Sequence, residues 1–220
     1  MAPKGKREEQ KGEIGTKLGA KTKLNLLNEE EIKRILDKCE EDQKPVIYTL
    51  AYTGMRVSEL IHMQKDWIDW EAGLIRIPES QRCESKYHPE CMRAKKIKGK
   101  IIKQSGLWRV KVHEAARGIP ILPELRPILE SFFKGHGSMG EVVKRRENVW
   151  RMVRHVTAKA GIQKRIFPHV LRGSLASLLA GKDFDALSIQ SFMGWKSVKT
   201  TDEYIRISPE RLKRIVEKKW

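Results

Sequence analysis

The apolar residues of this chain change their spacing twice, and this change constrains the fold more than any other feature. Up to residue 63 they recur at helical intervals, and from 67 to 122 they gather in short runs that favour β-strands. After Pro123 the helical spacing returns and continues to the end. No internal repeat is found. We therefore expect one α+β domain over residues 24–220, mostly helical with a small antiparallel β-sheet.

The first helix is expected to begin at Asn28, which has an N-cap side chain and is followed by three glutamates. Apolar residues then recur at helical spacing, at Ile32, Ile35, Leu36 and Cys39. A second helix is expected after Pro45, and Gly54 permits a break before a third, short helix from Arg56 to Met63. Arg56 is therefore expected at a junction between two helices.

The strands are expected in two pairs. Residues 67–70 and 74–77 flank a short turn with Gly73, and Trp108–Val112 is expected to pair with Gly118–Leu122. The segment 79–106 is rich in Lys and poor in large apolar side chains, so we expect a basic loop or insertion in the sheet. After Pro123 the spacing predicts helices over residues 125–133 and 142–156, three further short helices, and a last helix built on Leu212, Ile215 and Val216.

Charge indicates the class of partner. The 220 residues include 45 Lys and Arg against 28 Asp and Glu, a formal net charge of +17. With 40% hydrophobic and 33% charged residues, the chain is too apolar to be fully disordered and too charged for a membrane bundle. Such a positive excess attracts polyanions, which makes nucleic acid the expected partner and a merely lysine-rich or ribosome-associated protein the alternative.

No sequence feature points to export or to a membrane. No run approaches the roughly 18 apolar residues of a membrane span, and no apolar segment follows the basic N-terminus. The three cysteines do not resemble the framework of a secreted domain. We therefore expect a cytoplasmic protein without a membrane partner. Residues 1–23, with seven basic side chains and almost no apolar periodicity, are expected to form a flexible tail or linker.

Cys83, His88 and Cys91 lie close together in the segment 79–106 and have side chains that bind zinc. A fourth ligand such as His113 would complete a set. The spacing Cys-x4-His-x2-Cys is not that of a usual zinc knuckle, so a Cys83–Cys91 disulfide or free thiols are alternatives. On this pattern we expect no bound metal and no other cofactor.

A second cluster of reactive side chains lies in the segment 167–176. Pro168 suits the start of a helix, which would place His169 and Arg172 on one face at its positive end. Arginine binds phosphate oxygens through two parallel hydrogen bonds, and histidine can transfer a proton near neutral pH. Taken alone, the pair is better explained as a surface pair, because His-x-x-Arg is a short pattern.

The pair His169 and Arg172 is one of three separated motifs that occur in a fixed order along the chain. They are Thr53-Gly54-Met55-Arg56-Val57-Ser58-Glu59-Leu60, then His169-x-x-Arg172, then Met193-Gly194-Trp195 with Tyr204 nine residues after Trp195. This ordered set resembles the tyrosine recombinase/integrase family over about residues 24–210. In that family the first arginine lies in a Thr-Gly-x-Arg-x-x-Glu-Leu segment and the second in His-x-Leu-Arg. The nucleophilic tyrosine follows nine residues after a His or Trp.

The resemblance implies a role for each of these residues. Arg56 and Arg172 would bind the non-bridging oxygens of a DNA phosphate, and Tyr204 would attack the phosphorus. His169 would carry the tyrosine proton. The product would be a 3′-phosphotyrosine and a free 5′ hydroxyl, formed without ATP or a metal ion. Glu59 would support the site, or else be an ordinary surface carboxylate.

Some positions match the family pattern less closely. The family has a catalytic lysine on a β-hairpin ahead of an Ile-Pro segment, and Lys111 before Gly118-Ile119-Pro120 is the best match. The spacing is one residue long, so Lys103 and Lys100 are alternatives, as is a solvated strand lysine. Trp195 replaces the commoner histidine and can donate an indole N–H or pack in the core, but it cannot move protons. Gly173 replaces a histidine of bacterial relatives, a change expected to have little chemical consequence.

DNA contacts are expected well beyond the site. Residues 93–117 hold nine basic residues and one acidic residue, and 144–172 hold the same numbers. We expect a basic hairpin loop and a basic helical face opposite the Val/Trp stripe, although a solvated face has the same pattern. The DNA-binding residues predicted are Lys95, Lys96, Lys98, Lys100, Arg109, Lys144, Arg151 and Arg154.

The resemblance also implies an assembly. The family forms tetramers on double-stranded DNA, so we expect a monomer alone and a homo-tetramer on DNA, with the last helix docking on a neighbour or on its own domain. The separate N-terminal DNA-clamping domain of many relatives is not evident in this sequence. Composition and resemblance together favour a mobile element, such as an archaeal virus or plasmid. The alternatives from other classes are a type IB topoisomerase-like enzyme and a non-catalytic DNA-binding protein.

Overall fold

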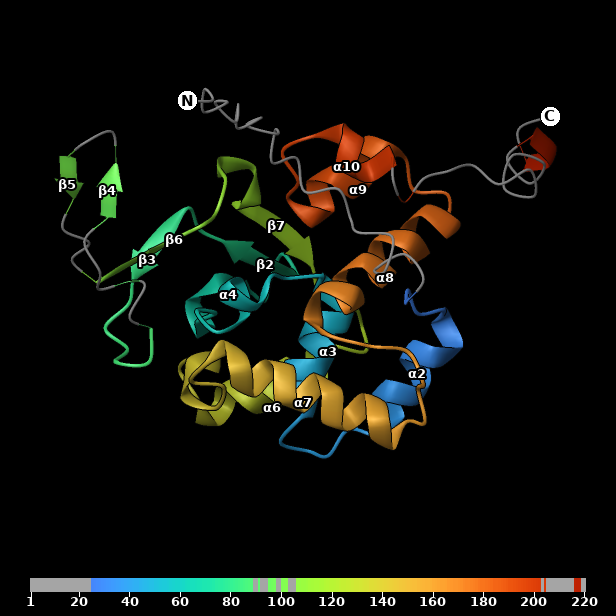
Figure 1. The fold of residues 1–220 in the computed structure, drawn as a ribbon, viewed down its shortest axis with the longest axis horizontal. Helices are drawn as coiled ribbons and strands as arrows, with labels where there is room; N and C mark the ends of the chain where they lie inside the picture. Colours follow the sequence, from blue (N-terminus) through green and yellow to red (C-terminus); the bar gives the residue numbers. More distant parts are fainter. Residues whose placement is uncertain are drawn as a thin grey trace, which may run out of the picture.

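The computed structural model describes residues 25–88, 91, 95–97, 100–102, 106–202, 204 and 216–218. The expected tail over residues 1–23 lies outside this set, as do Leu212 and Ile215 of the expected last helix. The helices and strands, labelled as in Figure 1, alternate as the change of spacing predicts, with strands between two helical parts. Within the described residues, no helix is long and apolar enough to cross a membrane.

In the part of the chain that the structure describes, three α-helices precede the strands. Helix α2 (Glu29–Asp37) begins at Asn28 with a capping box, because the Asn28 side chain accepts a hydrogen bond from the Glu31 N–H and the Glu31 carboxylate accepts one from the Asn28 N–H. Helix α3 (Lys44–Thr53) ends at Gly54, whose φ of 58° is the left-handed conformation that glycine adopts without strain. Helix α4 (Val57–Leu60) then begins directly after Arg56, so the predicted helix junction is confirmed.

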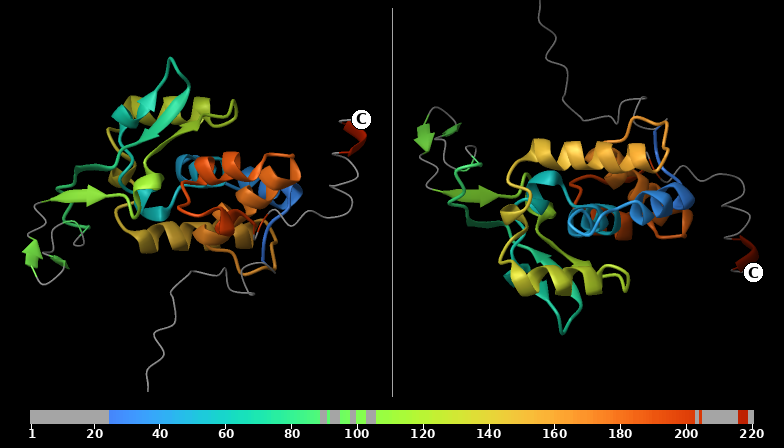
Figure 2. Two further views of the ribbon diagram at one scale, coloured as in Figure 1. Left: turned by 90° about the horizontal axis from the view of Figure 1, so that it is seen from above. Right: turned by 90° about the horizontal axis from the view of Figure 1, so that it is seen from below.

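The described strands form three small antiparallel sheets. The first contains β1 (Ile68–Asp69), β2 (Leu74–Ile77) and β7 (Arg117–Pro120), in the order β1-β2-β7. The second pairs β3 (Ser80–Arg82) with β6 (Leu107–Arg109), and the third pairs β4 (Lys95–Ile97) with β5 (Lys100–Ile102). In all views of Figures 1 and 2 the β4–β5 pair stands apart from the helices.

The expected pairing of Trp108–Val112 with Gly118–Leu122 is wrong. Strand β7 pairs with β2, which places Ile119 opposite Ile75 with both side chains fully buried, and β6 pairs with β3. The short 3-10 helix η2 (His113–Ala115) separates β6 from β7, so they do not form a hairpin. Residues 79–106, expected as a loop or insertion, contain the short strands β3, β4 and β5, and three residue pairs suffice for each of their pairings.

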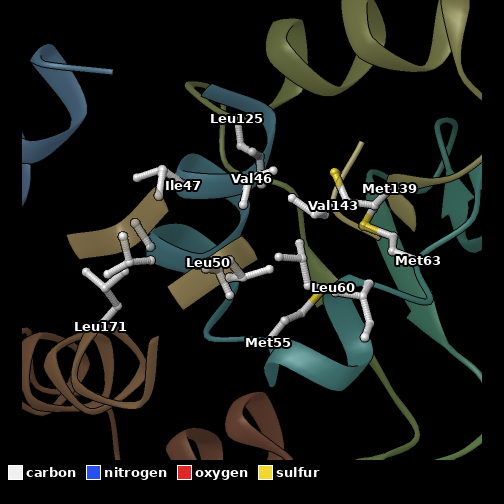
Figure 3. Packing of buried hydrophobic residues seen from close by; sticks show 14 of the residues in the cluster. Val46, Ile47, Leu50, Met55, Leu60, Met63, Leu125, Met139, Val143 and Leu171 are labelled. Atoms are coloured by element: carbon white, nitrogen blue, oxygen red, sulfur yellow. The ribbon is translucent and has the colours of Figure 1, made fainter. Parts of the chain in front are cut away.

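The second helical part packs around α3. It contains α6 (Arg126–Gly135), the 3-10 helix η3 (Met139–Glu141), α7 (Arg146–Lys159), α8 (Pro168–Gly181), α9 (Ala186–Met193) and α10 (Val198–Asp202), whereas the 3-10 helix η1 (Lys65–Trp67) lies between α4 and β1. Figure 3 shows Val46, Ile47 and Leu50 of α3 packing with side chains from later segments, including Leu125, Val143 and Leu171. This core holds α4 and α8 in fixed positions, and both carry residues of the predicted site.

Two expectations for the helical part need correction. The predicted helix over residues 142–156 begins only at Arg146, so Val142, Val143 and Lys144 precede α7. Trp150 is exposed and stacks on Phe167 at 5.1 Å between ring centroids, so the buried stripe is formed by Val149, Val153 and Val156 alone. Of the expected last helix, only residues 216–218 are described; they are helical, and Val216 is exposed.

Candidate active site

Arg56 directly precedes α4 as its N-cap and binds Glu59 through both its main chain and its side chain. Its main-chain N–H donates to Glu59 Oε2 at 2.9 Å, and its Nη1 donates to Oε1 of the same carboxylate at 2.7 Å. Its Nη2 donates to the carbonyl of Gly194 at 2.9 Å. The side chain keeps 18% of its surface exposed. Arg56 is therefore fixed in direction and still reaches solvent.

Arg172 lies on α8 and is 3% exposed. Its Nη1 donates to the carbonyl of Gly54 at the end of α3, and its Nη2 donates to the carbonyl of Met193 at the end of α9. The C-terminal carbonyls of a helix carry a partial negative charge, which favours a guanidinium there. Burial and the charge of Arg56 lower the pKa of Arg172, while the charge of Glu59 acts in the opposite direction.

Glu59 is 1% exposed and receives a second arginine, Arg117 from β7. Arg117 Nη2 donates to Glu59 Oε2 at 3.3 Å, and its Nε donates to the Phe192 carbonyl at 2.7 Å. Burial alone raises the pKa of the Glu59 carboxyl, but the charges of Arg117, Arg56 and Arg172 hold that pKa below its usual range. The surface-carboxylate alternative for Glu59 is therefore wrong.

His169 lies in the first turn of α8, one turn before Arg172, and is exposed. Partial burial of the ring lowers the pKa of His169, and the charges of Arg172, Arg56 and Lys111 lower it further. The imidazole is therefore neutral at pH 7, with a lone pair that can accept a proton. The helix start at Pro168 agrees with the prediction.

Lys111 is exposed and lies between β6 and η2, so it is not on a strand as expected. The strand β6 ends at Arg109 because its partner β3 is only three residues long. The charge of Lys111 nevertheless acts on His169. Of the alternatives, Lys103 lies outside the described residues, and Lys100 belongs to β5, of which only the backbone is described.

Trp195 and Tyr204 close one side of the site. Their rings stack with centroids 5.2 Å apart and an angle of 16° between planes, and the Arg172 guanidinium lies 5.8 Å from the Trp195 ring centroid. The Tyr204 hydroxyl lies close to α8, since a Cβ at Gly173 would be 3.2 Å from its oxygen. Gly173 thus leaves room for the tyrosine, a steric role that the expectation of little chemical consequence did not include.

Three arginines against one glutamate leave this site an excess of two positive charges. The bidentate geometry of arginine suits the oxygens of a phosphate. A neutral imidazole, an ammonium group and a phenol stand around these arginines, and together they can move protons and form a covalent bond to phosphorus. The arrangement therefore has the parts for phosphoryl transfer to a tyrosine.

Two features of this site were missed in the sequence. Arg117 stands directly before Gly118-Ile119-Pro120, but only the contact between β7 and α9 reveals its link to Glu59. Main-chain carbonyls of Gly54, Met193 and Gly194 bind the arginines, and Gly194, like Gly54, ends its helix at a positive φ of 60°. The glycines in the two motifs were the available signal.

The predicted DNA-binding residues are spread over several elements. Arg109 on β6 and Arg151 and Arg154 on α7 are exposed, whereas Lys144 is exposed in the loop before α7 and thus not on the helical face expected. Lys98 lies outside the described residues, and only the backbone is described for Lys95, Lys96 and Lys100.

The predicted metal ligands are partly brought together. Cys83, His88 and Cys91 are buried near one another, and all three cysteines of the chain are free, so the Cys83–Cys91 disulfide is not formed. The suggested fourth ligand is wrong, because His113 is exposed and lies 2.7 Å from the carboxylate of Glu79. His62 takes the position next to Cys91 instead.

Comparison with known proteins gives a consistent result. Residues 25–211 match the model of the phage integrase family. The chain is 28% identical over 201 residues to tyrosine recombinase XerA of Pyrococcus furiosus, covering 90% of this chain and 63% of that protein. It is 27% identical over 203 residues to tyrosine recombinase XerD of Bifidobacterium longum, covering 88% and 62%. The chain thus spans just under two thirds of the length of these relatives.

Solved structures show the same fold. The crystal structure of XerA recombinase aligns with a TM-score of 0.60 at 21% identity, covering 88% of this chain and 62% of that chain. The Tn1549 transposon integrase in complex with a circular intermediate DNA aligns with a TM-score of 0.64 at 16% identity, covering 88% and 65%. The catalytic domain of bacteriophage HP1 integrase aligns with a TM-score of 0.55 at 17% identity, covering 87% of this chain and 93% of that domain.

Proposed function

The chain belongs to the phage integrase family, and from this premise we propose that it is a site-specific DNA recombinase or integrase that uses Tyr204 as its nucleophile. One observation carries the proposal. Arg56 and Arg172 come from distant segments, yet they donate to the adjacent carbonyls of Gly194 and Met193, and the Tyr204 hydroxyl lies against the helix of Arg172. Two arginines and a tyrosine at one place match the needs of phosphotyrosyl chemistry.

The proposed reaction is a transesterification. The Tyr204 oxygen forms a bond to a DNA phosphorus while the bond from phosphorus to the 5′ oxygen breaks. The phenolic proton passes to His169, whose lowered pKa leaves it neutral, and Lys111 gives a proton to the departing 5′ oxygen. Arg56 and Arg172 stabilise the charge on the non-bridging oxygens. Because the ester conserves the bond energy, rejoining is the same step in reverse and needs neither ATP nor a metal ion.

Glu59 and Arg117 are positioning residues in this proposal. The Glu59 carboxylate orients Arg56, and Arg117 ties Glu59 to the end of α9. Trp195 stacks on Tyr204 and supports its ring, and its indole N–H supplies a donor for a phosphate oxygen. Because Arg172 is only 3% exposed, we expect the phosphate to meet Arg56 first and to reach Arg172 after Trp195 and Tyr204 shift.

The substrate proposed is double-stranded DNA carrying a specific site. The net charge of +17 and the exposed Arg109, Arg151 and Arg154 support backbone contacts, and the basic residues of β4 and β5 extend them. We propose a monomer that assembles as a homo-tetramer on DNA, acts in the cytoplasm, and serves a mobile element such as an archaeal virus or plasmid. Residues 24–220 form its catalytic domain, and residues 1–23 its basic tail.

Trapping the covalent intermediate tests the proposal. The protein is incubated with supercoiled plasmid and with a pool of labelled duplexes, without added divalent metal, and the reaction is stopped with SDS. We expect a protein–DNA adduct from the parent chain and none from Tyr204→Phe. Tyr48→Phe is the matched control, because Tyr48 is a part-buried tyrosine on α3 and should keep the adduct.

The products decide between the remaining alternatives. Joined strands from two duplexes indicate recombination, whereas relaxed plasmid without exchanged strands would replace this proposal by a topoisomerase-like activity. DNA binding without an adduct from the whole pool would indicate a non-catalytic DNA-binding protein. An adduct that survives in Tyr204→Phe would exclude Tyr204 as the nucleophile.

A further inference from the structure

Four buried side chains with metal-binding atoms lie together at the opposite end of α4 from Arg56. They are His62, Cys83, His88 and Cys91, and each is at most 7% exposed. The ligand atoms of His62, Cys83 and His88 all lie within 4.8 Å of one another. Cys83 Sγ is 3.3 Å from His88 Nδ1, and Cys91 Sγ is 3.3 Å from His62 Nε2. One thiol and two imidazoles therefore meet in one place, and the thiol of Cys91 adjoins this group through its contact with His62.

The second nitrogen of each ring is already bound to the main chain. His62 Nδ1 lies 2.7 Å from the carbonyl oxygen of Ser58, and His88 Nε2 lies 3.0 Å from that of Lys144. A carbonyl only accepts hydrogen bonds, so each of these nitrogens carries the proton. The other nitrogen of each neutral ring then presents its lone pair to the cysteines. This arrangement, with a carbonyl behind each histidine, is typical of the second layer around a bound metal.

The rings are also held in place by packing. His62 stacks on Trp108 with centroids 5.1 Å apart, and the His62 and His88 rings lie 4.3 Å apart. The His62 carbonyl accepts a hydrogen bond from Gln81 Nε2 at 2.5 Å, and Gln81 Oε1 accepts one from Trp67 Nε1 at 2.6 Å. A surface cavity lined by His62, Cys83 and His88 gives an ion a path to the cluster. The two histidine rings are therefore held in position in the structure without a bound ion.

We propose that His62, Cys83, His88 and Cys91 bind one zinc ion as a structural Cys2His2 site. In a tetrahedral zinc site, bond lengths of about 2.0–2.3 Å place neighbouring ligand atoms roughly 3.3–3.8 Å apart. The two S···N pairs at 3.3 Å already have this separation. Binding replaces the two thiol protons by bonds to zinc, so two protons are released for each ion.

Cys39, the third cysteine, lacks this environment. It is half-buried on the other side of the core, where its Sγ donates to the Ile35 carbonyl at 3.4 Å. Burial raises the pKa of the Cys39 thiol to about 12, so it stays protonated at neutral pH. Cys39 thus offers a matched control for substitutions at Cys83 and Cys91.

The ion would fix the base of the segment 83–106. The Cys83 N–H donates to the Gly106 carbonyl at 2.7 Å, which closes this segment at its two ends, and β4 and β5 lie within it. His62 closely follows α4 in the chain, and Arg56 directly precedes this helix. Gln81 of β3 donates to the carbonyl of His62, and Figure 1 shows β3 between the β4–β5 pair and α4. Zinc would therefore join the basic strands to the element that carries Arg56.

The test measures zinc in the complete chain. The protein is reconstituted with zinc under reducing conditions, passed through a desalting column, and analysed for metal. We expect one zinc ion per chain for the parent and for Cys39→Ser and His113→Ala, and a loss of at least tenfold in bound zinc for Cys83→Ser and His62→Gln. No retained zinc in the parent, or full retention in both of the latter variants, would overturn the proposal.

A spectroscopic measurement on the unmodified chain covers the case in which these variants do not fold. Cobalt(II) replaces zinc, and two thiolates in a tetrahedral site give intense visible bands together with sulfur-to-metal charge transfer. We expect these bands to saturate at one equivalent and to disappear when zinc is added. Weak bands of an octahedral ion, without charge transfer, would contradict a Cys2His2 site whatever the variants do.

Discussion

The two ends of α4 carry sites built on opposite principles. At its start, Arg56 joins Glu59, Arg117 and Arg172 in a buried set of charges. After its end, His62 joins two cysteines and a second histidine in a buried set that is neutral when the thiols are protonated. Only a few residues of the chain therefore separate a site made of charged side chains from a site made of imidazoles and thiols with lone pairs.

The difference shows what each site requires from the backbone. The arginines are fixed by carbonyls at the ends of α3 and α9, which supply negative charge without adding a carboxylate. The histidines are also held by carbonyls, but there the backbone serves to choose the tautomer. In the proposed function the first site uses its excess positive charge to bind a phosphate, and in the proposed zinc site two thiol protons leave when the ion binds.

The largest expected effect comes from removing the one negative charge of the arginine site. Glu59→Ala leaves Arg56 and the buried Arg117 without their carboxylate partner, so we expect the free energy of unfolding to fall by about 3–5 kcal/mol. Denaturant unfolding measures this change. Glu130→Ala is the control, because Glu130 pairs with Arg126 in the open and should cost about 0–1 kcal/mol. Equal losses in the two variants would show that the Glu59 carboxylate does not offset the charge of the buried arginines.

Zinc binding at the proposed site after the end of α4 should stabilise the folded protein. If the ion is present at 100 times its dissociation constant, the free energy of unfolding rises by about 2.7 kcal/mol. Unfolding curves with zinc and with a chelator measure the difference, and Cys83→Ser should abolish it. A zinc effect of the same size in Cys83→Ser would place the ion elsewhere.

The sequence predicted the charged site better than the neutral one, for a physical reason. Arg56, His169, Arg172 and Tyr204 each lie in a local motif with its own glycine, proline or spacing, so each could be found without knowing the fold. His62 lies in no such motif, and only the packing of β3 against α4 brings it to Cys91. Arg117 was missed for the same reason, since its partners come from α4 and α9.

The same difference between local and distant contacts decides which parts of the fold were predicted correctly. Helices were predicted well where caps and apolar spacing act within one segment, as at Asn28 and Pro168. Strand pairing was predicted wrongly, because the partner of β7 is decided by contacts over more than forty residues of chain between Ile75 and Ile119. Local signals therefore specify elements, while pairing depends on burial that only the assembled core provides.

A third prediction isolates the contact between a helix end and the arginines. Gly194 and Gly73 both have positive φ, of 60° and 64°, so alanine is strained at either position. Only at Gly194 would the Cβ also meet Arg117, at 2.9 Å from its Cδ, whereas nothing lies within 4 Å at Gly73. We expect Gly194→Ala to cost about 1–3 kcal/mol more than Gly73→Ala in denaturant unfolding. Equal costs would show that strain alone matters.

A fourth prediction concerns the approach of Tyr204 to α8. Gly173→Ala would place a Cβ 3.2 Å from the tyrosine oxygen, while Gly181→Ala on the same helix meets nothing within 4 Å. We expect Gly181→Ala to stabilise the protein by about 0.5–1 kcal/mol through helix propensity. Gly173→Ala should gain less and should slow adduct formation roughly tenfold by displacing the nucleophile. Unchanged adduct formation would show that Tyr204 is not fixed at this position before it reacts.

The smallest effect expected is a pH dependence confined to the arginine end of α4. Partial burial and the charges of Arg172, Arg56 and Lys111 lower the pKa of His169 in the folded protein, so the unfolded chain takes up a proton there first as the pH falls. Stability from this residue is therefore retained above the unfolded pKa of about 6.5 and is lost as the pH falls from that value through the folded pKa. Unfolding curves between pH 7 and pH 5 measure the loss of stability, and His169→Gln should make its dependence on pH shallower.

The same slope of stability against pH in both proteins would assign the dependence to another group. A slope that disappears only after the histidines around Cys83 are replaced would move the titrating site to the other end of the helix.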